Sequence, residues 1–167
     1  MKFSSAIVAL ALLLTIGVPP TAAADAPVGF QLMCLKMPQE CRGGGKSVID
    51  AEPSTMSLLK RVNLEVNGSI RPKRDGRVDQ WSVGVSQGDC EDYVLTKRRL
   101  LRKAGLPPSA LRIASVKTRA GEAHAVLVVR TTSGDYVLDN LTDAIRPLPK
   151  SGYRVSAMSS SDPRVWI

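Results

Sequence analysis

Histidine is almost missing from this sequence, because His124 is the only one among 167 residues. Catalysis by a Cys–His or a Ser–His pair would therefore have to use His124. Zinc or copper sites built from several histidines are excluded. A zinc site could only combine His124 with Cys90 and carboxylates while leaving Cys34 and Cys41 unpaired, and we do not favour this arrangement.

Aromatic residues are also scarce, with two Phe, two Trp and three Tyr. The formal net charge is +8, but the Lys and Arg residues are spread along the chain. Proteins that bind nucleic acid usually combine a basic face with stacking aromatics or a recognisable motif. We therefore expect no nucleic-acid partner. The charge suits a solvated basic surface or anionic partners in the cell envelope.

Long apolar runs are limited to one, over residues 6–18, which is too short to span a bilayer. It follows Lys2 and precedes three alanines at 22–24, a typical signal-peptide arrangement with cleavage before Asp25. A retained anchor is the alternative. The sequence predicts a signal peptide over 1–24, a single domain over 25–167 without a membrane span, and a periplasmic or secreted location.

Cysteine is present only three times, and an exported protein is expected to pair its cysteines. Cys34 and Cys41 lie seven residues apart with Pro38 between them, and this spacing predicts a disulfide. Cys90 is then left as a free thiol. It could be an inert packing residue, an intermolecular link or a reactive nucleophile.

Apolar periodicity and helix-end signals predict two helices followed by three strands. Asp89 is a suitable N-cap for the second helix, and Gly105 with Pro107 would end it. This order indicates an α+β fold with an antiparallel sheet. The first expected helix covers 53–67, and the second begins at Cys90 and ends at Gly105. The expected strands cover 111–117, 124–130 and 135–139.

Two connections complete this interpretation. The stretch CRGGGKS lacks the spacing of a phosphate-binding loop, so we expect a flexible loop after the cysteine hairpin and no organic cofactor. Residues 68–81 contain Pro72 and Gly76 and predict an exposed connection ending at Trp81.

The position of Cys90 at a helix start favours nucleophilic chemistry. A helix N-terminus favours the thiolate, and its free N–H groups can hold an oxyanion. His124, on a strand, would be the base, and Asp139 would orient the imidazole, with Asn140 and Asp143 as weaker substitutes.

The acids beside the thiol have two interpretations. Asp89, Glu91 and Asp92 can complement the helix dipole, or they can bind Ca²⁺, although they do not form an EF-hand pattern. On their own, Asp89 and Glu91 oppose a thiolate. Either they point away from Cys90 or a cation neutralises them.

The hairpin register is a further test of the His124–Asp139 pair. A loop centred on Ser133-Gly134 would place Asp139 opposite Val128, four residues from His124 and too far for a hydrogen bond. A loop centred on Thr131-Thr132 would place Asp139 opposite His124. The pairing predicts the second register or an irregular loop that achieves the same contact.

Three stretches in fixed order resemble the bacterial transglutaminase-like cysteine peptidases, which include the LapG-type periplasmic proteases. They are GDCEDYVLTKRRLLRKAG (88–105), GEAHAVLVV (121–129) and YVLDNLTDAI (136–145). The closing SGYRVSAMSSSDPRVWI and the early pair of cysteines resemble the short exported members. The resemblance extends over essentially all of residues 25–167.

This resemblance implies a papain-like, transglutaminase-like core in which a helix with an N-terminal cysteine packs on an antiparallel sheet. It makes Cys90 the nucleophile, His124 the general base and acid, and Asp139 the orienting carboxylate. It also implies Ca²⁺ binding at Asp89 and Glu91, with Asp92 as a further ligand. LapG-type enzymes cleave a surface adhesin, so the expected partner is a protein or peptide substrate, such as a cell-surface protein.

Three functions follow from these observations. The one we favour is hydrolysis of a peptide or amide bond through an acyl-enzyme. The second is transglutaminase-like acyl transfer to an amine with the same three residues. The third is a non-catalytic module that binds the envelope through a basic surface including Arg98, Arg99 and Arg102. The sequence does not specify an oligomeric state.

Overall fold

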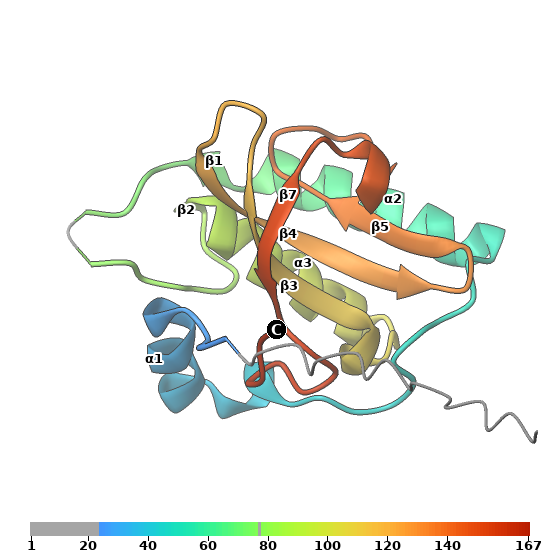
Figure 1. Cartoon of the computed structure of the whole chain (residues 1–167), viewed down its shortest axis with the longest axis horizontal. Coiled ribbons are helices and arrows are strands. Elements are labelled where there is room, and N and C mark those ends of the chain that lie inside the picture. Colours follow the sequence, from blue (N-terminus) through green and yellow to red (C-terminus); the bar gives the residue numbers. More distant parts are fainter. Residues whose placement is uncertain (1–23, 77) are drawn as a thin grey trace, which may run out of the picture.

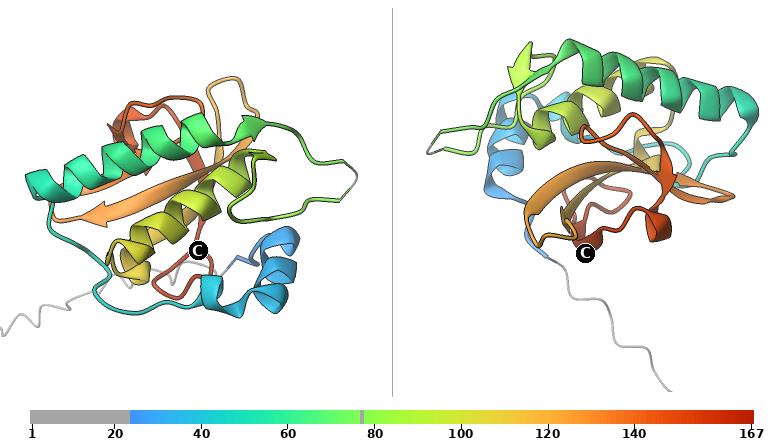
Figure 2. Two further views of the ribbon diagram at one scale, coloured as in Figure 1. Left: turned by 180° about the vertical axis from the view of Figure 1, so that it is seen from behind. Right: turned by 90° about the horizontal axis from the view of Figure 1, so that it is seen from above.

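A five-stranded antiparallel sheet forms the centre of the structure, with two long helices across one of its faces (Figures 1 and 2). The computed structural model describes residues 24–76 and 78–167. The strand order is β6-β5-β4-β3-β7. The elements, in chain order, are α1 (Val28–Lys36), the 3-10 helix η1 (Pro38–Cys41), α2 (Pro53–Ser69), β1 (Arg71–Pro72), β2 (Gln87–Gly88), α3 (Cys90–Lys103), the 3-10 helix η2 (Pro108–Ala110), β3 (Leu111–Lys117), β4 (Ala123–Thr131), β5 (Gly134–Leu138), β6 (Arg146–Pro147), the 3-10 helix η3 (Leu148–Lys150) and β7 (Arg154–Met158).

The predicted α+β fold and both predicted helices are confirmed, as are the three strands to within two residues at each end. The predicted signal peptide, residues 1–24, lies outside the described residues apart from Ala24. Within 24–76 and 78–167, no helix has both the length and the apolar character needed to cross a membrane.

Each face of the sheet buries its own apolar cluster because side chains alternate along a strand. Under the helices, β4 contributes Leu127 and Val129, which pack with residues of α2 and α3. On the other face, Val126 and Val128 pack with Tyr153 and with residues of η3 and β7. Strand β4 is therefore buried on both faces and gives a rigid base to any side chain at its end.

Helix α3 buries two of its cations, which is rare for charged side chains. The exposed fractions are 0% for Lys97 and 1% for Arg98. The guanidinium of Arg98 donates hydrogen bonds to the backbone carbonyls of Glu40 and Leu111. The prediction that Arg98 belongs to a basic surface is therefore wrong, since its charge is used to join α3 to η1 and β3.

The N-terminal part of the chain contains a helix that the sequence pattern did not reveal. Helix α1 carries apolar residues on all sides and has no stripe that periodicity could detect. Its Phe30 packs edge-on against Trp81 and Trp166, with ring centroids 5.5 and 5.9 Å away. The predicted Cys34–Cys41 disulfide is present, with the two Cα atoms 5.6 Å apart, and it joins α1 to η1.

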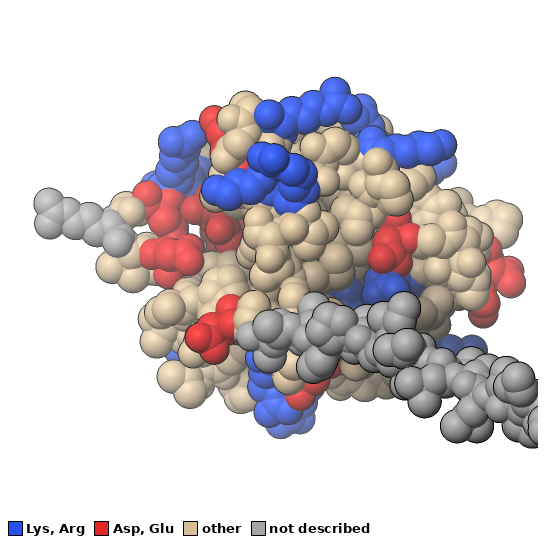
Figure 3. Space-filling view, viewed as in Figure 1, with Lys and Arg blue, Asp and Glu red and all other residues tan. Residues whose placement is uncertain are grey.

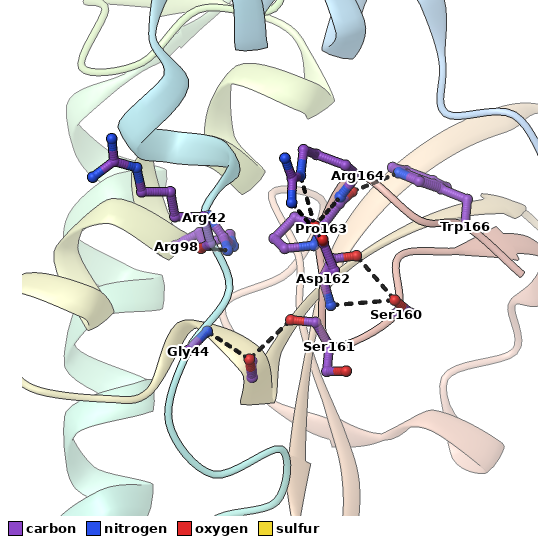
Figure 4. Close-up of polar contacts among 10 residues, drawn as sticks. Arg42, Gly44, Arg98, Ser160, Ser161, Asp162, Pro163, Arg164 and Trp166 are labelled. Carbon is purple, nitrogen blue, oxygen red and sulfur yellow. Dashed lines mark hydrogen bonds and ion pairs between the residues drawn. The ribbon is translucent and has the colours of Figure 1, made fainter.

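The glycine stretch after Cys41 is held in place, contrary to the flexible loop that we expected. The hydroxyl of Ser109 accepts a hydrogen bond from the Gly44 backbone N–H and donates one to the Ser161 carbonyl (Figure 4). A side chain at Gly43 would collide with that same carbonyl, because a Cβ there would lie 2.4 Å from it. The glycines allow the loop to pack closely against the C-terminal segment.

The connection between α2 and α3 is exposed over most of 71–80, as predicted, and it turns inward at Trp81. Its β1 pairs in parallel with β2, and Trp81 is only 6% exposed. The backbone N–H of Ser82 donates to the Asp92 carboxylate at 2.7 Å, which ties the connection to the first turn of α3. This connection forms one wall of the cleft described below.

Candidate active site

A cleft of about 740 Å³ lies where the N-terminus of α3 meets the start of β4. Cys90 and His124 both line it, one from each element. The segment between β1 and β2 forms a second wall, and Asn140 and Leu141 form part of a third. The fold therefore brings together a thiol and an imidazole that are 34 residues apart in sequence.

Cys90 is the first residue of α3 and the free cysteine of the part of the chain that the structure describes. Its thiol donates to the Glu91 carboxylate at 3.0 Å. Burial raises the pKa of the Cys90 thiol well above its usual range, and the negative charge of Glu91 raises it further. A hydrogen bond with the Ala125 backbone acts in the opposite direction. In this arrangement Cys90 is held as a thiol.

His124 is fixed by a carboxylate, as the sequence predicts. Its Nε2 lies 2.8 Å from Oδ1 of Asp139, and the exposed fractions of the two side chains are 6% and 3%. Burial by itself would raise the pKa of Asp139, but hydrogen bonds from His124, Tyr153 and the Leu141 backbone hold it below its usual value. An ionised carboxylate at Nε2 favours the tautomer that carries its proton there, which leaves Nδ1 as the basic nitrogen.

The hairpin register that brings His124 and Asp139 together is neither of the two that we considered. Thr131 pairs with Gly134, so the loop consists of residues 132 and 133. The last pair is Leu127 with Leu138, and Asp139 follows it beyond the end of β5. Continuing that register places Asp139 two residues from His124 along one face, a diagonal that long side chains can bridge. The prediction that the pair requires direct opposition is therefore wrong.

Tyr153 is a residue of this site that the sequence analysis missed. Its phenol donates a hydrogen bond to Oδ2 of Asp139, and its ring centroid lies 5.6 Å from that of His124. It precedes β7, a strand whose residues are mostly exposed and show no clear apolar alternation. The pairing of β7 with β3 brings it next to Asp139. One signal was available, since Tyr153 lies in the closing segment of the family resemblance.

The acids beside Cys90 turn in different directions. Asp92 is buried and faces Ser82, whereas Glu91 faces the thiol. The Asp89 carboxylate accepts from the Asp75 backbone N–H at 3.3 Å, so Asp89 occupies the N-cap position without making the expected side-chain cap. We expected that the acids which oppose a Cys90 thiolate either point away from it or are neutralised by a cation. The structure excludes the first explanation for Glu91, because its carboxylate contacts the thiol.

The pKa values of two of these acids are raised. Burial raises the pKa of Glu91 to about 7, with a hydrogen bond to Asp89 as the next cause. Burial also raises the pKa of Asp92 to about 6, against the hydrogen bond from Ser82. Acidic side chains gather on the side of the molecule where the β1–β2 connection lies (Figures 1 and 3). Among the residues that the structure describes, no cation is a cause of these shifts, although Lys73 and Arg74 line the same cleft.

The fit of these acids to a cation is partial. Oδ1 of Asp89 is buried and has no hydrogen-bond partner, which is the state expected of an oxygen available to a metal. Within residues 24–76 and 78–167, however, no three acidic, Cys or His side chains converge as a metal site. Asp89 and Glu91 fit as ligands, and Asp92 would have to leave its contact with Ser82 to join them.

The comparisons with known proteins agree with this architecture. The family model described as bacterial transglutaminase-like cysteine proteinase matches residues 21–167. The chain belongs to this family. It is a cysteine peptidase with a transglutaminase-like fold, which confirms the predicted family, fold class and enzyme class.

Solved structures with this fold include LapG from Legionella pneumophila. The calcium-bound form has a TM-score of 0.61 at 24% identity and covers 71% of each chain. A second LapG structure has a TM-score of 0.60 at the same identity and coverage. The EGTA-treated form has a TM-score of 0.54 at 24% identity, over 65% of this chain and 64% of LapG. No curated protein matches the chain.

Proposed function

We propose that this protein is an exported cysteine peptidase or amidase that uses Cys90, His124 and Asp139 to hydrolyse a peptide or amide bond. The observation that carries the proposal is the 2.8 Å contact between His124 and Asp139 at the cleft that Cys90 lines. His124 is the only histidine in the sequence, so no other imidazole could serve as the base.

The mechanism begins with proton transfer from the Cys90 thiol to Nδ1 of His124. The thiolate attacks the substrate carbonyl, and backbone N–H groups at the start of α3 stabilise the oxyanion. His124 then protonates the leaving amine, and an acyl-enzyme remains. Water, deprotonated by His124, hydrolyses this thioester. Asp139 holds the imidazole in position and stabilises its charged form throughout.

Asp89 and Glu91 would hold a calcium ion, with Asp92 as a third ligand after rotation away from Ser82. The orphaned oxygen of Asp89 and the raised pKa of Glu91, about 7, support this assignment. When bound, the ion would supply positive charge beside the thiol. Glu91 would then contact the metal instead of Cys90, which removes one of the causes that keep the thiol protonated.

The proposed substrate is a protein or peptide, and a cell-surface protein fits an exported enzyme. The location proposed is the periplasm or the exterior of the cell, from the signal-like residues 1–24. LapG-type proteins act on a surface adhesin, and the present chain shares their fold at 24% identity. The substrate class is therefore an inference from family membership and the signal sequence.

The test is the rate of Cys90 alkylation by iodoacetamide as a function of pH, compared with His124→Ala. Cys90 is the one cysteine outside the disulfide, so the reaction reports on a single thiol. With Ca²⁺ present, we expect rapid alkylation well below the pKa of about 8.5 of a free thiol, lost in the variant. Slow alkylation of both proteins, with and without Ca²⁺, would contradict the proposal.

Acyl transfer is separated from hydrolysis by the products. Cleavage of a peptide or a glutamine-containing protein is followed by mass spectrometry with and without an added primary amine. Hydrolysis predicts a free carboxylate in both samples. Incorporation of the amine into the product would instead identify a transferase that uses the same residues.

The binding-module alternative has less surface available than the sequence suggested. Arg98 is buried, and Arg99 and Arg102 both pair with Glu40, at 2.9 and 2.8 Å. Reversing the charge of Arg99 and Arg102 tests this alternative without disturbing the buried Arg98. A protein that keeps its function as Cys90→Ala but loses it on this reversal would be a binding module.

A further inference from the structure

A second hollow lies beside the active-site cleft and shares a wall with it. It has a volume of about 350 Å³, and it is lined by the last turns of α2 and by the segment that follows β5. Asn140 and Leu141 line both this second hollow and the cleft that contains Cys90. The mechanism above uses neither of these two side chains.

The shared wall is close to the reacting groups. Asn140 directly follows Asp139, whose Oδ1 lies 2.8 Å from Nε2 of His124. A cleft of about 740 Å³ is roughly 9 Å across, and an extended peptide rises about 3.3 Å per residue. A peptide that extends from Cys90 across Leu141 therefore enters the second hollow within about four residues of the bond to be cleaved.

The segment that forms the shared wall is fixed by hydrogen bonds. The side-chain amide of Asn67 donates to the Asp139 carbonyl at 3.0 Å and to the Asp143 carboxylate at 2.8 Å. Asn63 is fully buried and donates to the Asp143 carbonyl at 3.1 Å. The Leu141 backbone N–H donates to Oδ1 of Asp139 at 3.1 Å. The second hollow is therefore formed before any ligand binds.

The second hollow offers apolar surface and free space. The exposed fractions are 58% for Leu64, on α2, and 64% for Leu141. A single exposed leucine is ordinary on a protein surface, but these two line the same hollow, and Leu141 also lines the cleft. Gly68 contributes no side chain, and a Cβ there would meet no atom within 4 Å. A ligand side chain thus has both room and apolar contacts.

The charges around the second hollow disfavour an acidic ligand. Asp143 lines it, and its carboxylate is held by Asn67. Among the described residues, no Lys or Arg lines it. A ligand carboxylate placed there would lose water without gaining a cation. An apolar side chain would instead be stabilised by burial against Leu64 and Leu141.

We propose that the second hollow is a substrate subsite that binds a large apolar side chain, such as Leu, Met or Phe, within about four residues of the cleaved bond. This inference rests on the proposed function, because it names the peptide that the same cleft accepts. Leu64 and Leu141 are the residues that determine which side chain the subsite prefers.

The first experiment identifies the preferred cleavage sites. A peptide library, prepared by tryptic digestion of a denatured bacterial proteome, is incubated with the purified protein and Ca²⁺. Mass spectrometry of the new termini reports the sequence on both sides of each cleaved bond. We expect Leu, Ile, Met and Phe to be enriched roughly threefold or more at one position within about four residues of that bond. Asp and Glu should be depleted there.

Two variants with matched controls test whether the second hollow causes this preference. Gly68→Trp would fill it, and Ser57→Trp places the same side chain at an exposed position about three turns earlier on α2. Leu64→Ser removes apolar surface from it, and Leu35→Ser makes the same change at an 82% exposed position on α1. We expect the apolar preference to vanish in Gly68→Trp, to weaken in Leu64→Ser and to persist in both controls.

A synthetic peptide chosen from the cleaved set gives the size of the effect. Changing its apolar residue to Ala should lower kcat/KM of the wild type roughly five- to tenfold, because the side chain is only partly buried in an open hollow. Changing it to Asp should lower kcat/KM further. In Gly68→Trp, the peptides with the apolar residue and with Ala should be cleaved at similar rates.

The results separate a failure of the subsite from a failure of the proposed function. If wild type reacts rapidly with iodoacetamide but cleaves the library without an apolar preference, or if Gly68→Trp keeps the preference, the inference is wrong and the proposed function survives. The same holds if Ser57→Trp and Leu35→Ser lose the preference equally.

Two further outcomes would also overturn the inference. Rapid alkylation without cleavage of any peptide would show that the cleft accepts only a small amide. A change of oligomeric state in Gly68→Trp would show that the second hollow is an interface between copies of the chain. If wild type is alkylated slowly with and without Ca²⁺, the proposed function fails, and the inference fails with it.

Discussion

The phenol of Tyr153 donates a hydrogen bond to the Asp139 carboxylate oxygen that His124 does not contact. The two oxygens of Asp139 are thus held from two sides, by residues on different strands or their flanking loops. The Leu141 backbone N–H adds a third donor at 3.1 Å to the oxygen facing His124. Asp139 has little freedom to rotate, and the imidazole is oriented accordingly.

Replacing Tyr153 with Phe should slow the reaction without abolishing it. The ring would still pack on the sheet, but Asp139 would lose a hydrogen bond to its charged form, which is worth about 1.5–3 kcal/mol in general. Since Tyr153 acts through Asp139, we expect only part of this in the rate, a fall of roughly three- to tenfold. Alkylation kinetics of Cys90 measure it. Tyr136→Phe, on β5 outside the cleft, is the control and should leave the rate unchanged.

The stability of the protein should depend on the charge of Lys97. Its pKa is about 7 in the folded protein and 10.5 in the reference state, so between these values the unfolded chain binds more protons. Folding is therefore penalised fully below about pH 7, and the penalty is relieved as the pH rises toward 10.5. Urea unfolding should show Lys97→Met gaining stability over wild type at acid pH, with the gain shrinking at alkaline pH. A pH-independent difference would contradict this.

Calcium should stabilise the protein more at neutral than at acid pH. Glu91 and Asp92 have pKa values raised to about 7 and about 6, so the folded protein holds protons there that the unfolded chain has lost. The contribution of these two groups to the free energy of unfolding is largest at acid pH, and it declines as the pH rises through those values. A bound cation offsets that loss.

Thermal melts with Ca²⁺ and after EGTA should show this difference. Asp89→Asn removes the orphaned oxygen's charge and should abolish the calcium effect. Asp25→Asn, an exposed acid elsewhere, should retain it. An equal rise in Tm at acid and neutral pH, or its persistence in Asp89→Asn, would show that the ion binds elsewhere.

Removing the Cys34–Cys41 disulfide should lower the free energy of unfolding by about 2–3 kcal/mol. The crosslink closes a short loop and restricts the unfolded chain, so the loss comes mainly from the added freedom of that state. The double variant Cys34→Ser with Cys41→Ser can be compared with wild type by urea unfolding. Cys90→Ser is the control, since that thiol is free. No measurable loss would mean that α1 and η1 are held by packing alone.

Trp166 should contribute more to the free energy of unfolding than its neighbour Val165. It is 0% exposed, packs on Phe30 and donates its indole N–H to the Pro163 carbonyl at 2.9 Å. Trp166→Ala should cost about 3–5 kcal/mol through lost burial and a residual cavity. The neighbouring Val165 is 47% exposed, so Val165→Ala should cost far less. Similar losses for the two variants would show that the C-terminal segment does not pack as the structure has it.

Much of the site could be predicted because its chemistry is local or restricted by composition. The sequence places Cys90 at a helix start from the residues around it, and His124 is the only imidazole available. Helix α2 and strand β4 follow from periodic apolar residues. Helix α1 could not be recognised, because apolar residues surround it and leave no stripe.

The sequence by itself determined the residue types of the site, their order along the chain, the start of α3, the cysteine pair and the family. The tertiary structure decided the register that brings Asp139 to His124, the approach of Tyr153, the turn of Glu91 toward the thiol and the burial of Lys97. The reason is physical. Helix ends and apolar periodicity are set by near neighbours, whereas a buried charge or a hydrogen bond across strands depends on how distant segments pack.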